Sequence, residues 1–88
     1  MFEYDSDKSV SNKEKHGIDF EESQSLWEDY KRATAPAKEY GEERRFLIAS
    51  LKGKIWTAIY TVRLEKIRII SVRRARKNEK EIYNNTRI

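Results

Sequence analysis

The pattern of hydrophobic positions changes its period halfway along the chain. In the second half, three runs are rich in the β-branched and aromatic residues that favour strands: Arg45–Leu51, Lys54–Arg63 and Lys66–Arg74. The segments between these runs are short enough to be hairpin turns. The sequence therefore predicts an antiparallel meander of three strands.

Alternation along the middle strand gives the predicted sheet two different faces. One face receives the side chains of Trp56, Ala58, Tyr60 and Val62. We expect the helices to pack on one face of the sheet, while the face that carries Thr61 and Arg63 becomes polar towards these two residues.

The first half predicts two helices behind a short strand at residues 2–4. Asp5 is a good N-cap for the first helix, and Gly17 stands where a glycine commonly follows a helix. Only Val10 is clearly apolar inside this helix, so its docking should be shallow. Asp19 opens a second helix, and a glutamate three residues later completes a capping-box pattern.

The remaining segments complete an α+β domain. Residues 31–43 hold the one proline and a glycine, and they read as a loop with a short edge strand around residues 37–40. Residues 75–85 predict a third helix, with Ile82 and Tyr83 as its anchors. We expect a single domain over residues 1–84, in which two N-terminal helices pack on a small antiparallel sheet, and a flexible tail at residues 85–88.

Charge is divided unevenly between the two halves. The net charge is +4, but residues 1–43 carry −6 and residues 44–88 carry +10. This asymmetry favours an anionic partner for the second half. The alternative is that the acidic half folds onto the basic half and neutralises it.

Residue counts narrow the possible chemistry and location. The chain has no cysteine, one histidine and three glycines, so a thiolate metal site, a two-histidine zinc motif and a glycine-rich phosphate loop are not expected. We expect no bound metal and no cofactor. No apolar run approaches the length of a membrane span, and the N-terminus does not resemble a signal peptide. These features indicate a small soluble cytoplasmic protein that does not interact with a membrane.

Arginines stand at the ends of the predicted strands. Strict alternation places Arg68 and Arg74 on one face of the last strand and Arg73 on the other. Antiparallel pairing brings Arg44 near Arg63, and Arg63 near Arg68, but leaves Arg73 and Arg74 at the far end of their strand. The sequence therefore predicts two basic zones.

Guanidinium groups bind phosphate oxygens bidentately and keep their charge. Arg63, Arg73 and Arg74 are therefore candidate ligands for phosphate, and the alternative is that they pair with the acidic helices. Arg76 and Lys77 either extend the basic surface or form a solvated helix start. Cleavage of RNA by attack of the ribose 2′-hydroxyl needs only a base, an acid and stabilisation of charge.

Several residues could transfer protons or stack on a base. The candidates for proton transfer are Glu43, Tyr60, Tyr83, His16 and the lysines. Trp56 and Tyr60 either offer a stacking face to an unpaired base or belong to the core. His16 has the alternative role of completing a helix end, and Glu43 that of a plain turn residue.

Two blocks of the sequence resemble the BrnT family of ribonuclease toxins from type II toxin–antitoxin pairs. One block is KHGIDF, at residues 15–20, and the other is RIISVRRA, at residues 68–75. The resemblance extends over residues 2–83, where GEERRFLIAS and GKIWTAIYTVR lie between the two blocks.

This resemblance implies a RelE-like fold and a metal-independent endoribonuclease that halts translation. It also implies a cognate BrnA-like antitoxin, a toxin–antitoxin heterotetramer, and binding of operator DNA only through the antitoxin complex. As catalytic residues it suggests Arg63, Arg73, Arg74, Glu43 and Tyr83. As RNA-binding residues it suggests Arg44, Tyr60 and Thr61, and the charge of the second half adds Arg68, Arg76 and Lys77.

Two other functions remain open. The basic half can bind RNA or DNA without cutting it, in which case RNA stays intact and binding is salt-sensitive. It can also serve only to receive an acidic antitoxin, in which case RNA does not bind at all.

Overall fold

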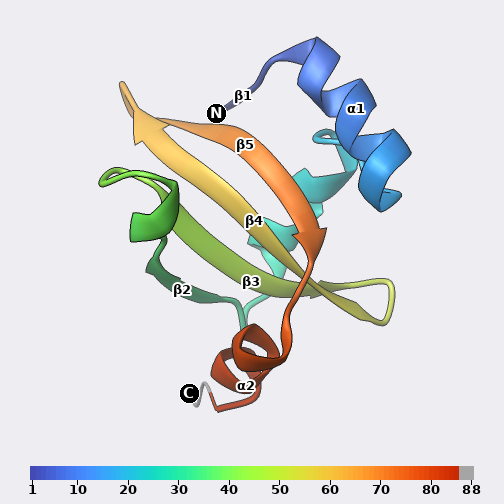
Figure 1. Ribbon diagram of the computed structural model, residues 1–88, viewed down its shortest axis with the longest axis vertical. Coiled ribbons are helices and arrows are strands. Elements are labelled where there is room, and N and C mark those ends of the chain that lie inside the picture. The colour runs from blue at the N-terminus through green and yellow to red at the C-terminus, as the bar shows by residue number, and fades with distance from the viewer. Residues whose placement is uncertain (86–88) are drawn as a thin grey trace.

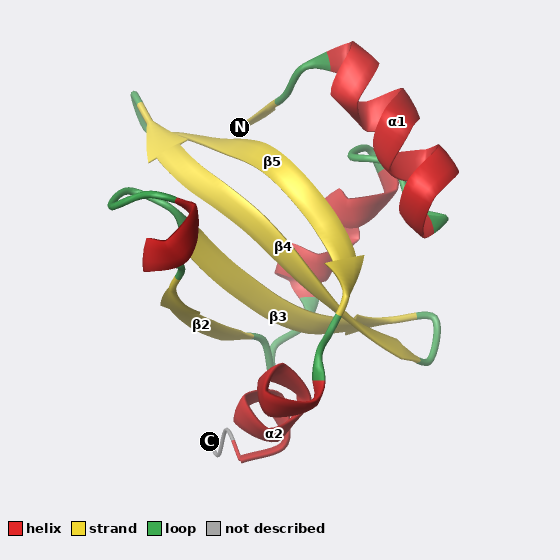
Figure 2. Cartoon of the chain, in the orientation of Figure 1, coloured by secondary structure: helices red, strands yellow, loops and turns green. Residues whose placement is uncertain are grey.

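The computed structural model describes residues 1–85 as a five-stranded sheet with helices on both faces (Figure 1). The strands, shown as arrows in Figure 2, are β1 (Phe2–Glu3), β2 (Ala33–Pro36), β3 (Arg45–Leu51), β4 (Lys54–Arg63) and β5 (Lys66–Arg74). Over the same residues there are two α-helices, α1 (Ser6–His16) and α2 (Lys77–Asn85), and two 3₁₀ helices, η1 (Glu22–Glu28) and η2 (Lys38–Tyr40). None of these helices is long and apolar enough to cross a bilayer. The predicted tail lies outside the described residues except for Asn85, which ends α2.

The predicted meander is confirmed with its bounds. Strands β3, β4 and β5 pair antiparallel in sequence, and the sheet has the order β1-β5-β4-β3-β2. The predicted first strand is present as β1, which pairs parallel with β5 through Phe2 and Ile67. The mixed α+β class is therefore confirmed.

The main core lies between the sheet and the N-terminal segments. Trp56, Ala58 and Tyr60 of β4 face Phe20 and Leu26, and all five are buried. In Figure 1, η1 passes behind the sheet and α1 runs beside β5. The face of β4 predicted to hold the N-terminal segments does so.

A β-bulge in β5 changes which of its residues share a face. Ile59 pairs with Ser71 and Tyr60 with Ile69, so Ile70 is an extra residue in β5. Beyond the bulge Arg68 pairs with Thr61 and lies on the polar face. The prediction that Arg68 shares a face with Arg74 is therefore wrong, because strict alternation does not continue through a bulge.

Helix α1 begins and ends as predicted but docks through polar side chains. Asp5 caps its N-terminus, and Gly17 follows it with a left-handed φ of 82°. Val10 is 61% exposed, whereas Ser9 and Asn12 are buried. The Asn12 side chain bonds to both the N–H and the C=O of Val72, at distances of 3.1 and 2.8 Å. It thereby continues the hydrogen bonding of the sheet at the β5 edge.

The predicted second α-helix is instead the 3₁₀ helix η1. The predicted capping box is present, with the Glu22 N–H donating to Asp19 Oδ1 and the Asp19 N–H donating to Glu22 Oε1. The buried residues that follow, Phe20, Ser23 and Leu26, are spaced by three. A spacing of three aligns side chains along a 3₁₀ helix and not along an α-helix.

The edge strand is also shifted from its predicted position. It spans Ala33–Pro36 and pairs antiparallel with β3, whereas Lys38–Tyr40 form the 3₁₀ helix η2. Pro36 ends the strand at the sheet edge, where a missing N–H is tolerated. The prediction assigned Pro36 to a loop and therefore placed the edge strand after the proline, whereas the strand lies before it and includes it.

Of the two anchors predicted for the C-terminal helix α2, Tyr83 is confirmed, since it is half-buried and donates to Asp29 Oδ2, but the most buried anchor was not predicted. Ile82 is 40% exposed, and the buried residue is Glu79, which is only 2% exposed. The Arg76 N–H donates to the Glu79 carboxylate over 2.8 Å, as in a capping box. A charged group therefore fixes this helix to the sheet.

We predict that the turn between β4 and β5 can be improved. Leu64 and Glu65 have φ values of 51° and 66°, which side chains with a β-carbon rarely adopt. Replacing them with Asn and Gly, the preferred pair for a turn with two positive φ angles, should raise the free energy of unfolding by about 1–2 kcal/mol. Urea denaturation would measure the change. The control Glu65→Lys keeps its β-carbon and should change stability by less than about 0.5 kcal/mol; an equal gain in both proteins would contradict the explanation.

Candidate functional site: a basic groove

A groove of about 560 Å³ lies on the polar face of the sheet. Four cations line it, Lys8, Arg44, Arg63 and Arg68, together with the carboxylates of Glu42 and Glu43. Thr61 and Ile70 belong to the sheet beneath, and Tyr40 stands at the side. The charged lining has a net charge of +2.

Strand register brings these residues together from distant parts of the chain. Arg45 pairs with Tyr60, which sets Arg44 beside the next position of β4, Thr61. Thr61 pairs in turn with Arg68 on β5. The predicted proximity of Arg44, Arg63 and Arg68 is therefore confirmed.

A tight turn presents the two carboxylates. The Arg44 N–H donates to the Gly41 carbonyl, and the Ala37 N–H donates to the Arg44 carbonyl, each over 3.0 Å. Gly41 has a φ of 134°, which favours glycine, and a β-carbon there would lie 3.2 Å from Arg44 Cγ. The turn thus leaves Glu42 and Glu43 exposed at its tip.

The cations of the groove differ in how far they are neutralised. Arg68 lies 3.6 Å from a carboxylate oxygen of Glu3. Within residues 1–85, Arg44 and Arg63 form no ion pair. Two guanidinium groups are thus available to an anion beside two free carboxylates.

Arg73 shares this face of the sheet but is occupied by Glu79. Its two terminal nitrogens each donate to one carboxylate oxygen over 2.8 Å. The Thr57 hydroxyl donates to the same carboxylate, also over 2.8 Å. Burial opposes ionisation of Glu79, but the bonds from Arg73, the Arg76 N–H and Thr57 outweigh it and lower the pKa of Glu79 to about 2. The ion-pairing alternative therefore applies to Arg73, with α2 as the source of the acid.

Arg74 lies on the opposite face of the sheet. Its guanidinium carbon is 5.6 Å from the centre of the Trp56 ring. The register places Arg73 beside Thr57 and Arg74 beside Trp56, whereas Arg63 pairs with Lys66 at the other end of β4. The predicted separation of Arg63 from Arg73 and Arg74 is confirmed, but Arg73 and Arg74 lie on opposite faces and do not form one basic zone.

Two tyrosines proposed for chemistry lie away from the groove. The Tyr83 hydroxyl donates to Asp29 Oδ2 over 2.7 Å, and burial together with this bond raises the pKa of Tyr83 to about 12. Tyr60 is 7% exposed and packs edge-on against Trp27. Tyr60 is therefore a core residue, as is Trp56, and neither offers a free face to a base.

The other candidates are distributed between separate surfaces. Arg76 and Lys77 are exposed at the start of α2, beyond the end of β5 that is distant from Arg68. His16 ends α1 and lines a hollow on the core side of the sheet. No group of three or more His, Asp or Glu side chains within residues 1–85 is arranged to hold a metal ion.

Three polar side chains of the groove, Lys8, Tyr40 and Glu42, were not among the predicted site residues. Glu42 adjoins the predicted Glu43, so the doubled carboxylate was a usable signal. Tyr40 was not considered as a site residue, because the prediction placed residues 37–40 in an edge strand. Lys8 carried no signal, because only the docking of α1 beside β5 brings it to the groove.

The fold and groove define a small basic α+β protein with an open cationic groove on its sheet. Residues 4–79 match the family described as the ribonuclease toxin, BrnT, of type II toxin–antitoxin systems. This match covers most of the 88 residues, and the chain belongs to the BrnT family. Membership of a type II family implies an antitoxin partner. No curated protein matches the chain.

We predict that the Glu79 carboxylate makes the free energy of unfolding depend on pH. Because its pKa of about 2 lies below the ordinary 4.5, its contribution is present above about pH 4.5 and is lost as the pH falls towards 2. At pH 7 the free energy of unfolding of Glu79→Gln should be about 2–3 kcal/mol lower than that of the wild type. Urea denaturation at pH 7, 5 and 3 should show this gap closing with acid. A gap that stays constant would refute the role of the carboxylate charge.

Proposed function

We propose that the protein is a metal-independent endoribonuclease that binds RNA along the basic groove. One observation carries this proposal. Arg44 and Arg63, which form no ion pair within residues 1–85, stand in the same groove as Glu42 and Glu43. Paired donors to phosphate beside a carboxylate are what cleavage by a ribose hydroxyl requires. Membership of a family of ribonuclease toxins supports the substrate class.

In this mechanism the RNA supplies its own nucleophile. The 2′-hydroxyl oxygen attacks the adjacent phosphorus and passes its proton to the Glu43 carboxylate. The bond to the 5′-oxygen of the next nucleotide breaks, and that oxygen takes a proton from water, which leaves a cyclic phosphate and a 5′-hydroxyl; the hydroxide formed takes the proton from Glu43 and restores its carboxylate. Arg44 and Arg63 hold the non-bridging oxygens, where negative charge increases in the transition state.

The other basic residues have separate roles. Lys8 and Arg68 line the same groove and would contact flanking phosphates. Arg73 is a positioning residue, because both its terminal nitrogens bond to Glu79. Arg76 and Lys77 would add only long-range attraction for RNA.

The cellular role follows from the same reading. We expect cleavage to halt translation in the cytoplasm and a BrnA-like antitoxin to neutralise the toxin. We also expect the pair to form a heterotetramer that reaches operator DNA through the antitoxin. A RelE-like fold belongs to this proposal, and an antiparallel meander packed against N-terminal helical segments supports it.

The first test is cleavage of a labelled RNA by the purified protein in excess EDTA. The wild type should cleave it, and Arg63→Gln should lower the single-turnover rate by about 100-fold because a donor to the transition state is lost. Glu43→Gln should cost at least as much. Glu42→Gln, its neighbour in the same turn, is the matched control and should stay within about threefold of wild type.

A second control separates the two faces. Arg74→Gln removes the same charge from the far side of the sheet and should leave the cleavage rate unchanged. A loss of activity in Arg74→Gln equal to that in Arg63→Gln would contradict the assignment of the site to the groove. Intact RNA with salt-sensitive binding would instead favour a binding module that does not cleave.

A further inference from the structure

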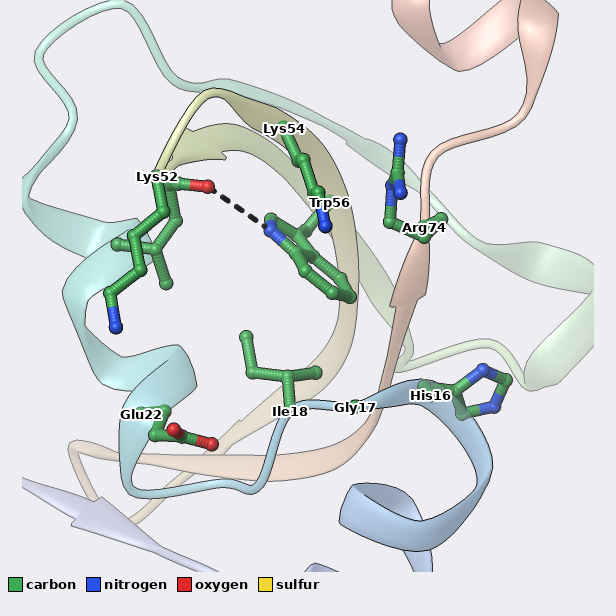
Figure 3. A pocket seen from close by; sticks show the side chains of 9 residues that line it. His16, Gly17, Ile18, Glu22, Lys52, Lys54, Trp56 and Arg74 are labelled. Atoms are coloured by element: carbon green, nitrogen blue, oxygen red, sulfur yellow. Dashed lines mark hydrogen bonds between the residues drawn. The ribbon is translucent and has the colours of Figure 1, made fainter.

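A hollow of about 250 Å³ lies on the core side of the sheet, away from the groove. It opens where the β3–β4 turn meets the corner between α1 and η1 (Figure 3). Ile18 and Trp56 stand in the middle of this view, Lys52 and Glu22 on one side, and Arg74 and His16 on the other. The proposed cleavage uses none of these residues.

The floor of the hollow is apolar and already packed. Ile18 is buried, Trp56 is 8% exposed, and Leu51 lies beside them half-buried. The Trp56 N–H donates to the Leu51 carbonyl over 3.4 Å, and the Arg74 guanidinium lies over the indole ring. A nucleic-acid base therefore finds no open aromatic face here, and the apolar surface that the hollow leaves open belongs mainly to the half-buried Leu51.

The rim of the hollow is positively charged. Lys52, Lys54 and Arg74 are exposed, and within residues 1–85 none of the three forms an ion pair. The carboxylate in the lining, Glu22, accepts bonds from Lys13 over 2.8 and 3.0 Å. Glu22 lowers the positive potential near Lys52 but leaves Lys54 and Arg74 without a counter-charge.

Lys52 occupies a conformation that does not suit a lysine. Its φ is 53° at the first position of the two-residue turn between β3 and β4, where Asn is preferred. Gly53, with a φ of 78°, does suit the second position. Leu64 and Glu65 have similar φ values in the β4–β5 turn, so the strain alone does not indicate a function, but it places Lys52 at the edge of the hollow.

We propose that this hollow receives an acidic segment of the antitoxin, with an apolar side chain beside Leu51 and carboxylates against Lys52, Lys54 and Arg74. The apolar floor and cationic rim together complement such a segment better than they complement RNA. The inference takes its partner from the proposed function. It does not depend on the groove or on catalysis.

The test compares binding of the purified cognate antitoxin to variants of the full chain by calorimetry. Lys54→Gln/Arg74→Gln should raise the Kd about tenfold, because two charge-assisted contacts are lost. Affinity for RNA and the cleavage rate should not change. The control Lys77→Gln/Lys80→Gln removes two exposed charges from α2 and should leave the Kd within about twofold of wild type.

Lys52→Asn separates binding from folding. It should raise the Tm, because Asn suits the left-handed turn position, and yet weaken antitoxin binding. Wild-type antitoxin affinity in Lys54→Gln/Arg74→Gln would overturn the proposal. So would a fall in RNA affinity alone, which would make the hollow part of an RNA path. An absence of RNA cleavage in the wild type would refute the proposed activity and leave this binding test readable.

Discussion

The structure depends on one buried carboxylate. Glu79 is 2% exposed and accepts hydrogen bonds from Thr57 on β4, Arg73 on β5 and the backbone at the start of α2. A buried charge of this kind is tolerable only when all its partners are present. The Arg73 guanidinium that it fixes lies 5.7 Å from the Phe46 ring, which packs edge-on against Tyr40 at the groove. A contact at the C-terminal helix therefore determines where one wall of the groove stands.

The bulge at Ile70 divides the arginines of β5 between two surfaces. Without it, Arg68 would share a face with Arg74 and would not reach the groove. With it, Arg68 joins Arg44 and Arg63, while Arg74 stays over Trp56 on the core side. One strand thus supplies cations to both faces of the sheet. The positive charge of the second half of the chain is therefore divided between two modest basic surfaces and does not form one large patch.

Patterns among neighbouring residues were sufficient to predict the strands and the helix caps. They were not sufficient to predict the contacts that hold these elements together. Alternation and turn spacing predicted β3, β4 and β5, and Asp5 and Gly17 predicted the ends of α1, because these signals lie within a few residues. The bulge at Ile70 and the buried Asn12 and Glu79 depend on partners far along the chain. No local pattern reports such partners. In the groove, Arg44, Arg63, Arg68 and Glu43 were predicted, whereas Lys8 needed the docked position of α1.

Helix α1 connects the two surfaces. Lys8 in its first turns lines the groove, and His16 at its end lines the hollow. At 1.5 Å per residue these positions are separated by about 12 Å along the helix axis. A partner segment held in the hollow therefore needs only about two helical turns along α1 to reach the groove. A segment anchored beside Arg74 in the proposed way could thus also contact Lys8 at the groove, although the hollow and the groove lie on opposite faces of the sheet.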